Sequence, residues 1–288
     1  MSDPESIEGE VVYTPQSPLA DPIGLLRDQW TDLMRSRELA TRLIIRNISA
    51  RYRQTLLGYF WAIFPMVATT FIWLVLSRRN VVQVAMPQGS YALFLLTGMM
   101  LWQTFVDSVQ APLRVVSESK SMLAKINFPR EALMLAALGE VLFSFATRLV
   151  ILIVGWFYLN GGVPPMTLLL GPFGILAVIM YGMTIGVLLV PLGVLFQDVT
   201  QGLALVFQVW LLATPVLYPA QEGWSEHWLA WVNPVGSLIT VTRDWILIGP
   251  SDLNSMFLAI FGLTALFVFF GLVLYRVAMP ILIERMQS

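Results

Sequence analysis

Long stretches without a charged residue divide this chain into apolar segments. Asp, Glu, Lys and Arg do not occur in five ranges, which are residues 54–77, 80–106, 149–197, 199–221 and 253–275. A charged side chain at the centre of a bilayer costs about 2.5 to 3.5 kcal/mol on insertion scales. A membrane-spanning helix needs roughly 20 apolar residues. Each charge-free range is therefore long enough to contain a spanning helix.

The longest charge-free range is interrupted by NGGVPP at residues 160–165, whose Asn, Gly and Pro content is typical of a turn. A further apolar run around residue 140 contains Glu140 and Arg148 and is otherwise free of charge. The pattern predicts six transmembrane helices, near residues 56–76, 91–113, 131–158, 167–196, 200–218 and 254–275.

The basic residues predict the orientation, because Lys and Arg accumulate in cytoplasmic loops of membrane proteins. Seven precede the first predicted span, four follow the second span closely, and two follow the last span, whereas the opposite loops contain only Arg78, Arg79 and Arg243. We therefore expect both termini to be cytoplasmic.

The regions before the first span and after the last differ in character. Residues 1–22 contain five acidic residues and four prolines, which predicts a disordered acidic cytoplasmic tail. Residues 23–53 place apolar side chains at three- and four-residue intervals among arginines, with Trp30 as an aromatic anchor. This pattern predicts an amphipathic helix in the membrane interface, with a soluble helix that packs on a cytoplasmic partner as the alternative. Residues 278–288 form a short cytoplasmic C-terminal tail.

The segment between the last two predicted spans, near residues 219–249, is too polar to cross the bilayer but contains four tryptophans. Tryptophan is enriched at the headgroup level, so we expect two short re-entrant helices that dip into the outer leaflet. Pro234 and Gly236 supply the break between them. The predicted fold is an all-α polytopic membrane protein whose six-span domain covers residues 54–277.

Composition excludes several kinds of chemistry. Hydrophobic residues make up 57% of the chain and charged residues 12%, against roughly 25% in soluble domains. The chain has no cysteine, and a lone His227 cannot form a multi-histidine metal site, so we interpret it as a loop or interface residue. The two lysines, Lys120 and Lys125, are not in a phosphate-binding GxxxxGK[ST] loop, and HExxH and GxSxG are absent. We expect neither catalytic residues nor a metal in this chain.

Three charged residues lie in the interior of predicted spans, away from their ends, namely Asp107, Glu140 and Arg148. Such residues are rare inside membranes and mark functional positions by default. We expect them to form a structural ion cluster within the helix bundle. A direct contact with a substrate and a proton relay are the alternatives.

Five segments resemble one known family in their order and spacing. They are RNISARYRQTLLGYFWAIFPM, YALFLLTGMMLWQTF, INFPREALML, LFQDVTQGLALVFQVWLLATPVLYP and WLAWVNPVGSLITVTRDWILIG. Together they are similar to the membrane subunit of bacterial ABC transporters that export polysaccharides such as O-antigen, capsule and teichoic acid. The resemblance begins near residue 40, and the acidic N-terminal tail has no counterpart in it.

The resemblance implies a homodimer in the bacterial cytoplasmic membrane, assembled with two copies of a separate ATPase that binds ATP and Mg²⁺. It also implies contact with membrane lipids and a lipid-linked glycan substrate, and no nucleic acid. Residues near 117–127 look like the family's coupling helix, which docks on the ATPase. The implied docking residues are Glu118, Lys120, Met122, Leu123, Lys125 and Asp198.

The family's export channel runs between two protomers past aromatic residues, whose faces suit a sliding sugar chain. The channel-lining candidates are Phe60, Trp61, Phe64, Phe71, Trp73, Phe207, Trp210 and Tyr218. Any of these rings can instead face lipid or neighbouring helices. At the joint between interface helix and first span, the candidate gate residues are Trp30, Arg46, Arg51 and Arg53.

Other functions stay open at this point. An ABC permease of similar architecture that exports a drug or a lipid is the first alternative. An integral-membrane enzyme acting on lipid-linked sugars is the second, although the chain shows no catalytic constellation. A proton-coupled carrier is the third, and its uptake would collapse with an uncoupler.

Overall fold

The computed structural model describes residues 36–53, 58, 60–81, 90–123, 130–159, 163–220 and 228–287 of this chain. Within these ranges the regular structure is entirely helical, which confirms the all-α prediction. In chain order the helices are α2 (Arg37–Arg53), α3 (Phe60–Arg78), α4 (Tyr91–Glu118), α5 (Lys120–Leu123), α6 (Glu131–Leu159), the 3₁₀ helix η2 (Met166–Leu170), α7 (Gly171–Leu195), α8 (Gln197–Ala213), α9 (Trp228–Val232), α10 (Pro234–Leu247) and α11 (Asn254–Gln287). The predicted acidic tail, Trp30, His227 and Lys125 lie outside the described residues.

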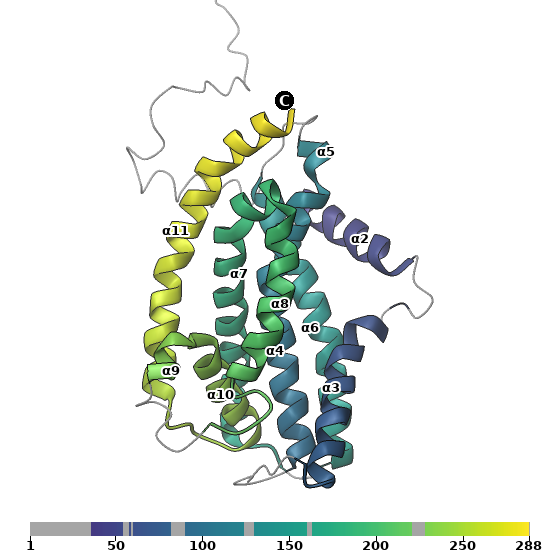
Figure 1. The fold of residues 1–288 in the computed structure, drawn as a ribbon, viewed down its shortest axis with the longest axis vertical. Coiled ribbons are helices and arrows are strands. Elements are labelled where there is room, and N and C mark those ends of the chain that lie inside the picture. The colour runs from purple at the N-terminus through teal and green to yellow at the C-terminus, as the bar shows by residue number, and fades with distance from the viewer. Residues whose placement is uncertain are drawn as a thin grey trace, which may run out of the picture.

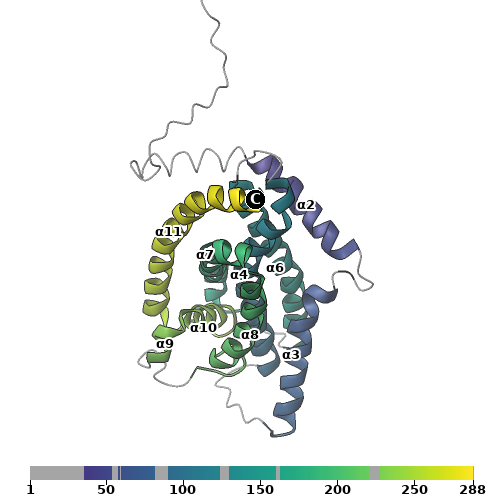
Figure 2. The ribbon, with the colours of Figure 1, turned by 45° about the horizontal axis from the view of Figure 1, so that its top comes forward.

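Most of the long helices run along the long axis of the molecule, whereas α2 lies obliquely across the bundle (Figure 1). The chain's C-terminus, α2 and α5 lie at one end, here called the α5 end. Helices α9 and α10 lie at the other end, here called the α10 end. In the turned view, α11 curves along the side of the bundle (Figure 2), where it packs against α7.

Five helical segments are long and apolar enough to cross a membrane. They are Phe60–Arg78, Tyr91–Glu118, Glu131–Leu159, Met166–Leu195 and Asn254–Pro280. These five coincide closely with five of the six predicted spans. The remaining prediction, residues 200–218, falls on α8, which has 17 residues and ends at Ala213. At 1.5 Å per residue this helix is only about 26 Å long, so a sixth span stays a prediction.

Two helices, α9 and α10, do lie between α8 and α11, and the break between them falls at Asn233 and Pro234. Their depth in a membrane stays a prediction. The Asn233 amide nitrogen donates to the carbonyl oxygen of Ala213 at 3.2 Å and to the Thr214 hydroxyl at 2.9 Å. Its carbonyl oxygen accepts from the Trp210 indole at 2.9 Å. One amide thus satisfies polar groups at the end of α8 that have no water available.

Helix α10 is buried along almost its whole length, including Arg243 and Trp245. The Arg243 guanidinium donates to the Pro215 carbonyl oxygen at 2.9 Å and lies 3.7 Å from the ring centroid of Phe94. A carbonyl acceptor and an aromatic face are favourable partners for a buried cation. These contacts attach the α8–α9 connection to α4 and α10.

Helix α4 forms the centre of the bundle, with buried residues around its whole circumference, and it packs against α3, α6, α7 and α10. Its closest approach is to α7. A Cβ atom added at Gly186 would lie 2.5 Å from the Val109 carbonyl oxygen, and one added at Gly182 would lie 2.6 Å from the Ser108 Cβ. Small residues let helix backbones approach closely inside a membrane bundle.

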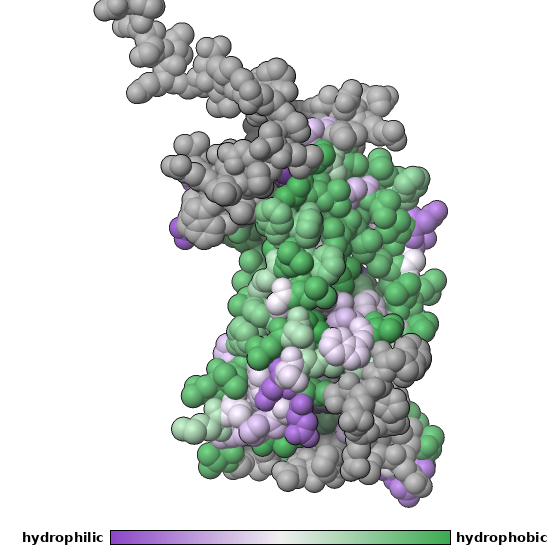
Figure 3. Space-filling view, turned by 90° about the vertical axis from the view of Figure 1, so that its left-hand side faces the viewer, coloured by the Kyte–Doolittle hydropathy of each residue, from purple (hydrophilic) through white to green (hydrophobic). Residues whose placement is uncertain are grey.

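Helix α3 packs far less completely, since only Met66 and Thr70 are buried along it. Its exposed side chains are mainly large and apolar, as are those on the outer faces of α6 and α11. The face shown in Figure 3 carries a broad apolar belt, with polar side chains more frequent toward the α10 end. An apolar exterior of this kind requires lipid or another protein around it.

Replacing Gly186 with valine should destabilise the bundle, because the contacted atoms are backbone oxygens that cannot rotate away. Overpacking of this kind costs about 1 to 3 kcal/mol. Thermal unfolding of the purified protein in detergent measures the effect. The matched control is Gly262→Val in α11, where an added Cβ meets nothing within 4 Å. Equal stabilities for the two variants would contradict the close α4–α7 contact.

Candidate functional site

The α5 end gathers the segments for which the sequence predicted contact with a partner. The short helix α5 directly follows α4 and contacts α11 (Figure 1). The Lys120 ammonium donates to the Val194 carbonyl oxygen at 2.8 Å, near the end of α7. Helix α8 begins three residues after Val194. A single hydrogen bond therefore joins α5 to the α7–α8 corner.

The predicted docking residues differ in their exposure. Glu118 and Asp198 are exposed, and Lys120 and Met122 are half-buried. Leu123 is only 5% exposed and packs with the core at this end, including Val116 and Ala132. Its side chain anchors α5 to its own chain. Among the described residues here, Glu118, Ser121 and Asp198 have exposed polar side chains.

A buried carboxylate connects three helices near the same end. Glu140 of α6 is 1% exposed, and its Oε2 atom accepts hydrogen bonds from Arg51 of α2 and Arg114 of α4, both at 2.8 Å. Its Oε1 atom accepts from the Asn47 amide at 2.9 Å, and Asn47 in turn accepts from Arg46 at 3.0 Å. We call these five side chains the Glu140 network.

Helix α2 reaches the Glu140 network through one side, because Ala40, Leu43 and Asn47 follow each other at helical spacing and are all buried. Helix α2 packs against α6 along this side. Asn47 is a polar residue at an otherwise apolar position of the buried side. That exception in the periodicity is the signal by which sequence alone could have identified it as a site residue.

A second ion pair lies deeper in the bundle. The Arg148 guanidinium of α6 pairs with the Asp107 carboxylate of α4 at 2.5 Å, and its Nε atom donates to the Ala62 carbonyl oxygen of α3 at 3.2 Å. Ala62 lies three residues before Pro65, which interrupts the hydrogen bonding of α3. Arg148 thus ties the first predicted span to the centre of the bundle.

The three intramembrane charges therefore belong to two separate groups. Glu140 and Arg148 are eight residues apart on α6, about 12 Å along the helix axis. Each has its own partners of opposite charge, and no described salt bridge joins them to each other. The sequence predicted a single cluster because it could not show that Arg51 and Arg114 approach Glu140 from other helices.

The aromatic channel candidates fall on two surfaces. On α3, Phe60, Trp61 and Phe64 are exposed and contact one another, with ring centroids 5.4 to 6.3 Å apart. Phe71 is also exposed, and Trp73 is half-buried against the core. On α8, by contrast, Phe207 is buried. The exposed rings of Phe60, Trp61, Phe64 and Phe71 thus give α3 an aromatic outer surface.

The α8 aromatics pack against α4 of their own chain. Phe207 and Trp210 contact Trp102 and Phe105 at centroid distances of 5.4 to 6.4 Å. Tyr218 follows α8 and donates from its hydroxyl to the Leu212 carbonyl oxygen at 3.0 Å. Trp102 and Phe105 were not among the sequence candidates, although the spacing of three residues places both on one side of α4.

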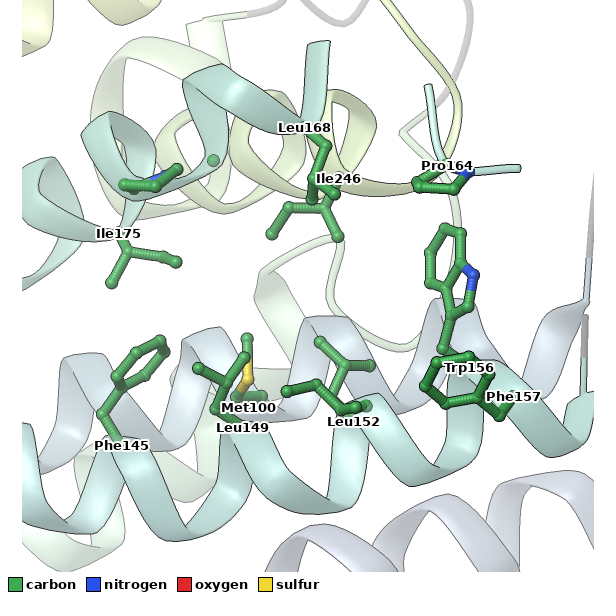
Figure 4. A pocket seen from close by; sticks show the side chains of 13 residues that line it. Met100, Phe145, Leu149, Leu152, Trp156, Phe157, Pro164, Leu168, Ile175 and Ile246 are labelled. Atoms are coloured by element: carbon green, nitrogen blue, oxygen red, sulfur yellow. The ribbon is translucent and has the colours of Figure 1, made fainter. Parts of the chain in front are cut away.

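One cavity of about 490 Å³ opens between α6 and the start of α7 (Figure 4). Its walls include Leu149, Leu152 and Trp156 of α6, with Ile175 and Ile246 on the opposite side. The lining is apolar and offers no acid, base or nucleophile. In the described ranges there is also no group of three His, Cys, Asp or Glu residues that could hold a metal ion.

The Arg148–Asp107 pair generates a stability prediction. Arg148→Met leaves Asp107 without its cationic partner inside the bundle, which should cost on the order of 3 kcal/mol. The double variant Arg148→Met, Asp107→Leu removes both charges and should recover most of that loss. Thermal unfolding of the wild type, both single variants and the double variant tests this coupling. Additive losses would contradict a direct interaction between the two side chains.

Comparison with known proteins supplies the family. Residues 38–247, from α2 to the end of α10, match the family described as ABC-2 type transporter. The O-antigen export system permease protein RfbA of Myxococcus xanthus is 26% identical over 217 residues, which cover 73% of this chain and 80% of that protein.

Two further relatives are O-antigen export system permease proteins RfbA of Klebsiella pneumoniae. One is 24% identical over 225 residues and the other 25% identical over 224, covering 77% and 76% of this chain and 84% and 83% of those proteins. The family match covers almost all of α2, the Glu140 network and the Arg148–Asp107 pair together. This chain is a multi-pass membrane protein that belongs to the ABC-2 type transporter family.

Proposed function

We propose that this chain is the transmembrane subunit of an ABC transporter that exports a lipid-linked polysaccharide across the bacterial cytoplasmic membrane. The observation that carries the proposal is the similarity to three O-antigen export permeases along 80% or more of their length. O-antigen, capsule and teichoic-acid-like glycans are the substrate classes concerned. A separate ATPase subunit binds ATP and Mg²⁺ and supplies the energy.

The α5 end is the proposed side of ATPase docking and faces the cytoplasm together with both termini. The clustering of basic residues in the sequence supports this orientation. Three exposed polar side chains lie there. They are Glu118 at the end of α4, Ser121 on α5 and Asp198 at the start of α8. Lys120 stabilises their relative position through its bond to Val194.

The Glu140 network is the proposed route from the docking surface to the first span. Arg114 lies one helical turn before Glu118, so a displacement of the end of α4 also moves Arg114. Through Glu140 this displacement reaches Arg51, near the last residue of α2. Helix α3 follows α2 in the chain. The hydrogen bond from Arg148 to the Ala62 carbonyl oxygen holds α3 in its present position, and in this proposal α3 leaves that position during transport.

The exposed side of α3 is the proposed conduit and dimer seam. Phe60, Trp61, Phe64 and Phe71 are large apolar side chains that this chain leaves uncovered. A second copy of the chain can cover part of this surface, and the remaining rings can face the sugar chain. Phe207 and Trp210 pack against Trp102 of their own chain. In this conformation we therefore assign them a structural role behind the seam and not a contact with the sugar chain.

The docking surface predicts that charge reversal weakens ATPase binding. In this proposal Glu118 and Asp198 face cationic residues of the ATPase. Glu118→Lys and Asp198→Lys change exposed side chains and should reduce the ATPase retained on the tagged permease about tenfold, because like charges then face each other across the interface. Co-purification measures retention. Arg79→Glu is the matched control, because Arg79 is exposed and directly follows the last residue of α3, away from the α5 end. Leu123→Asp is unsuitable, since it buries a charge.

Deletion of the gene in its native host tests the exported substrate. We expect surface polysaccharide to disappear and a lipid-linked glycan to accumulate inside, with both effects reversed by the wild-type gene. Immunoblotting of surface glycan and extraction of lipid-linked sugars provide the measurements. Unchanged surface glycan with a new drug sensitivity or an altered lipid distribution would instead identify a drug or lipid exporter. Turnover of lipid-linked sugars by the purified chain alone would identify an enzyme.

A further inference from the structure

The Glu140 network contains more positive than negative charge. Its charged members are Arg46, Arg51, Arg114 and Glu140, which leave an excess of two positive charges. Within the described part of the chain, Glu140 is the only carboxylate that forms a salt bridge with either Arg51 or Arg114. Among the described residues the network therefore lacks the negative charge needed for balance.

Arg51 and Arg114 are held close together despite their like charges. Both donate to the same Oε2 atom of Glu140, so their guanidinium groups adjoin each other. Each guanidinium has five N–H donors, of which this oxygen engages one. The Nε atom of Arg114 is buried and has no hydrogen-bond partner among the described residues. The two arginines therefore have more donors than Glu140 engages, and this unused capacity favours a further acceptor at their exposed nitrogens.

Both arginines remain accessible from outside the bundle. Their side chains are 34% exposed for Arg51 and 28% for Arg114, whereas Glu140 beneath them is 1% exposed. An approaching ligand thus meets the two guanidinium groups before the carboxylate. Tetrahedral phosphate oxygens match the donor geometry of adjacent guanidinium groups, which bind phosphate by paired hydrogen bonds.

The position of the network favours a phosphate that belongs to a lipid. Helix α4 has 28 residues and is about 42 Å long, more than the roughly 30 Å of the hydrocarbon core. Arg114 lies on its second-last turn, within reach of the headgroup region. A lipid headgroup at this depth can therefore reach the two guanidinium groups.

We propose that Arg46, Arg51 and Arg114 bind the phosphate of an anionic membrane phospholipid. The bound phosphate offsets the excess charge and accepts hydrogen bonds from the guanidinium groups. The lipid then stabilises the contact of α2 with α4 and α6. The site requires neither a nucleotide nor an exported glycan, so it stands independently of the proposed function.

The test is equilibrium binding of dioctanoyl phosphatidylglycerol to the purified full chain in nonionic detergent. Binding should be saturable and at least tenfold tighter than that of dioctanoyl phosphatidylcholine. Arg51→Gln and Arg114→Gln should each weaken it about tenfold, the effect of losing hydrogen bonds to a charged group.

Arg42→Gln is the matched control, because Arg42 is an exposed arginine of α2 that pairs with Glu38 outside the network. It should bind like the wild type, and weakening equal to that of Arg51→Gln would overturn the proposal. Arg51→Lys keeps the positive charge and replaces Arg51→Gln in the test if the latter does not fold. Its affinity for the lipid should lie between those of the wild type and Arg51→Gln. Competition by inorganic phosphate at equal concentration would overturn the assignment to a lipid. Tenfold tighter binding of an isoprenyl diphosphate would overturn the assignment to a phospholipid.

Discussion

The carboxylate of Glu140 is the interaction on which the arrangement of the α5 end depends. A buried charge is tolerated only when partners of opposite charge and hydrogen-bond donors surround it. Glu140 obtains those partners from two other helices, and so determines where α2 and α4 lie relative to α6. An apolar contact between the same helices could slide by a turn, whereas the donors of Asn47, Arg51 and Arg114 match the two oxygens in one register only.

The rest of the bundle is organised around α4 in a different way. There is little driving force for apolar side chains to leave lipid, so close packing and polar contacts must supply the association of helices. Gly182 and Gly186 allow α7 to approach α4 at backbone distance. Asn233 and Arg243 satisfy carbonyl oxygens at the other end, where the chain leaves regular helix. Close packing thus dominates at the centre, and polar contacts dominate at the two ends.

Charge gaps and turn residues predicted much of this fold from sequence. Five of the six expected spans coincide with long helices, and the NGGVPP segment falls between the end of α6 at Leu159 and the start of η2 at Met166. The sixth expected span, residues 200–218, stays a prediction, because apolar character continues past Ala213 while the helix ends there. The backbone at Thr214 is extended, and Asn233, nineteen residues later, supplies the polar contacts that make this ending possible.

The candidate site was less predictable, because its residues meet only through tertiary structure. Sequence identified Glu140, Asp107 and Arg148 as unusual within the membrane, but their actual partners come from distant helices. The sequence also could not show which side chains are exposed. The residue spacing around Leu123 and Phe207 fits either the buried or the exposed side of a helix. Neither periodicity nor composition distinguishes a side chain that anchors its helix from one that awaits a partner.

The short length of α8 has a consequence for the surrounding membrane. A helix of about 26 Å is shorter than the roughly 30 Å thickness of a typical hydrocarbon core, and lipids adjust to such a mismatch by local thinning. Beside α4, which is about 42 Å long, no such adjustment is required. If α8 crosses the membrane as the sixth span, the bilayer beside it must therefore be thinner than the bilayer beside α4.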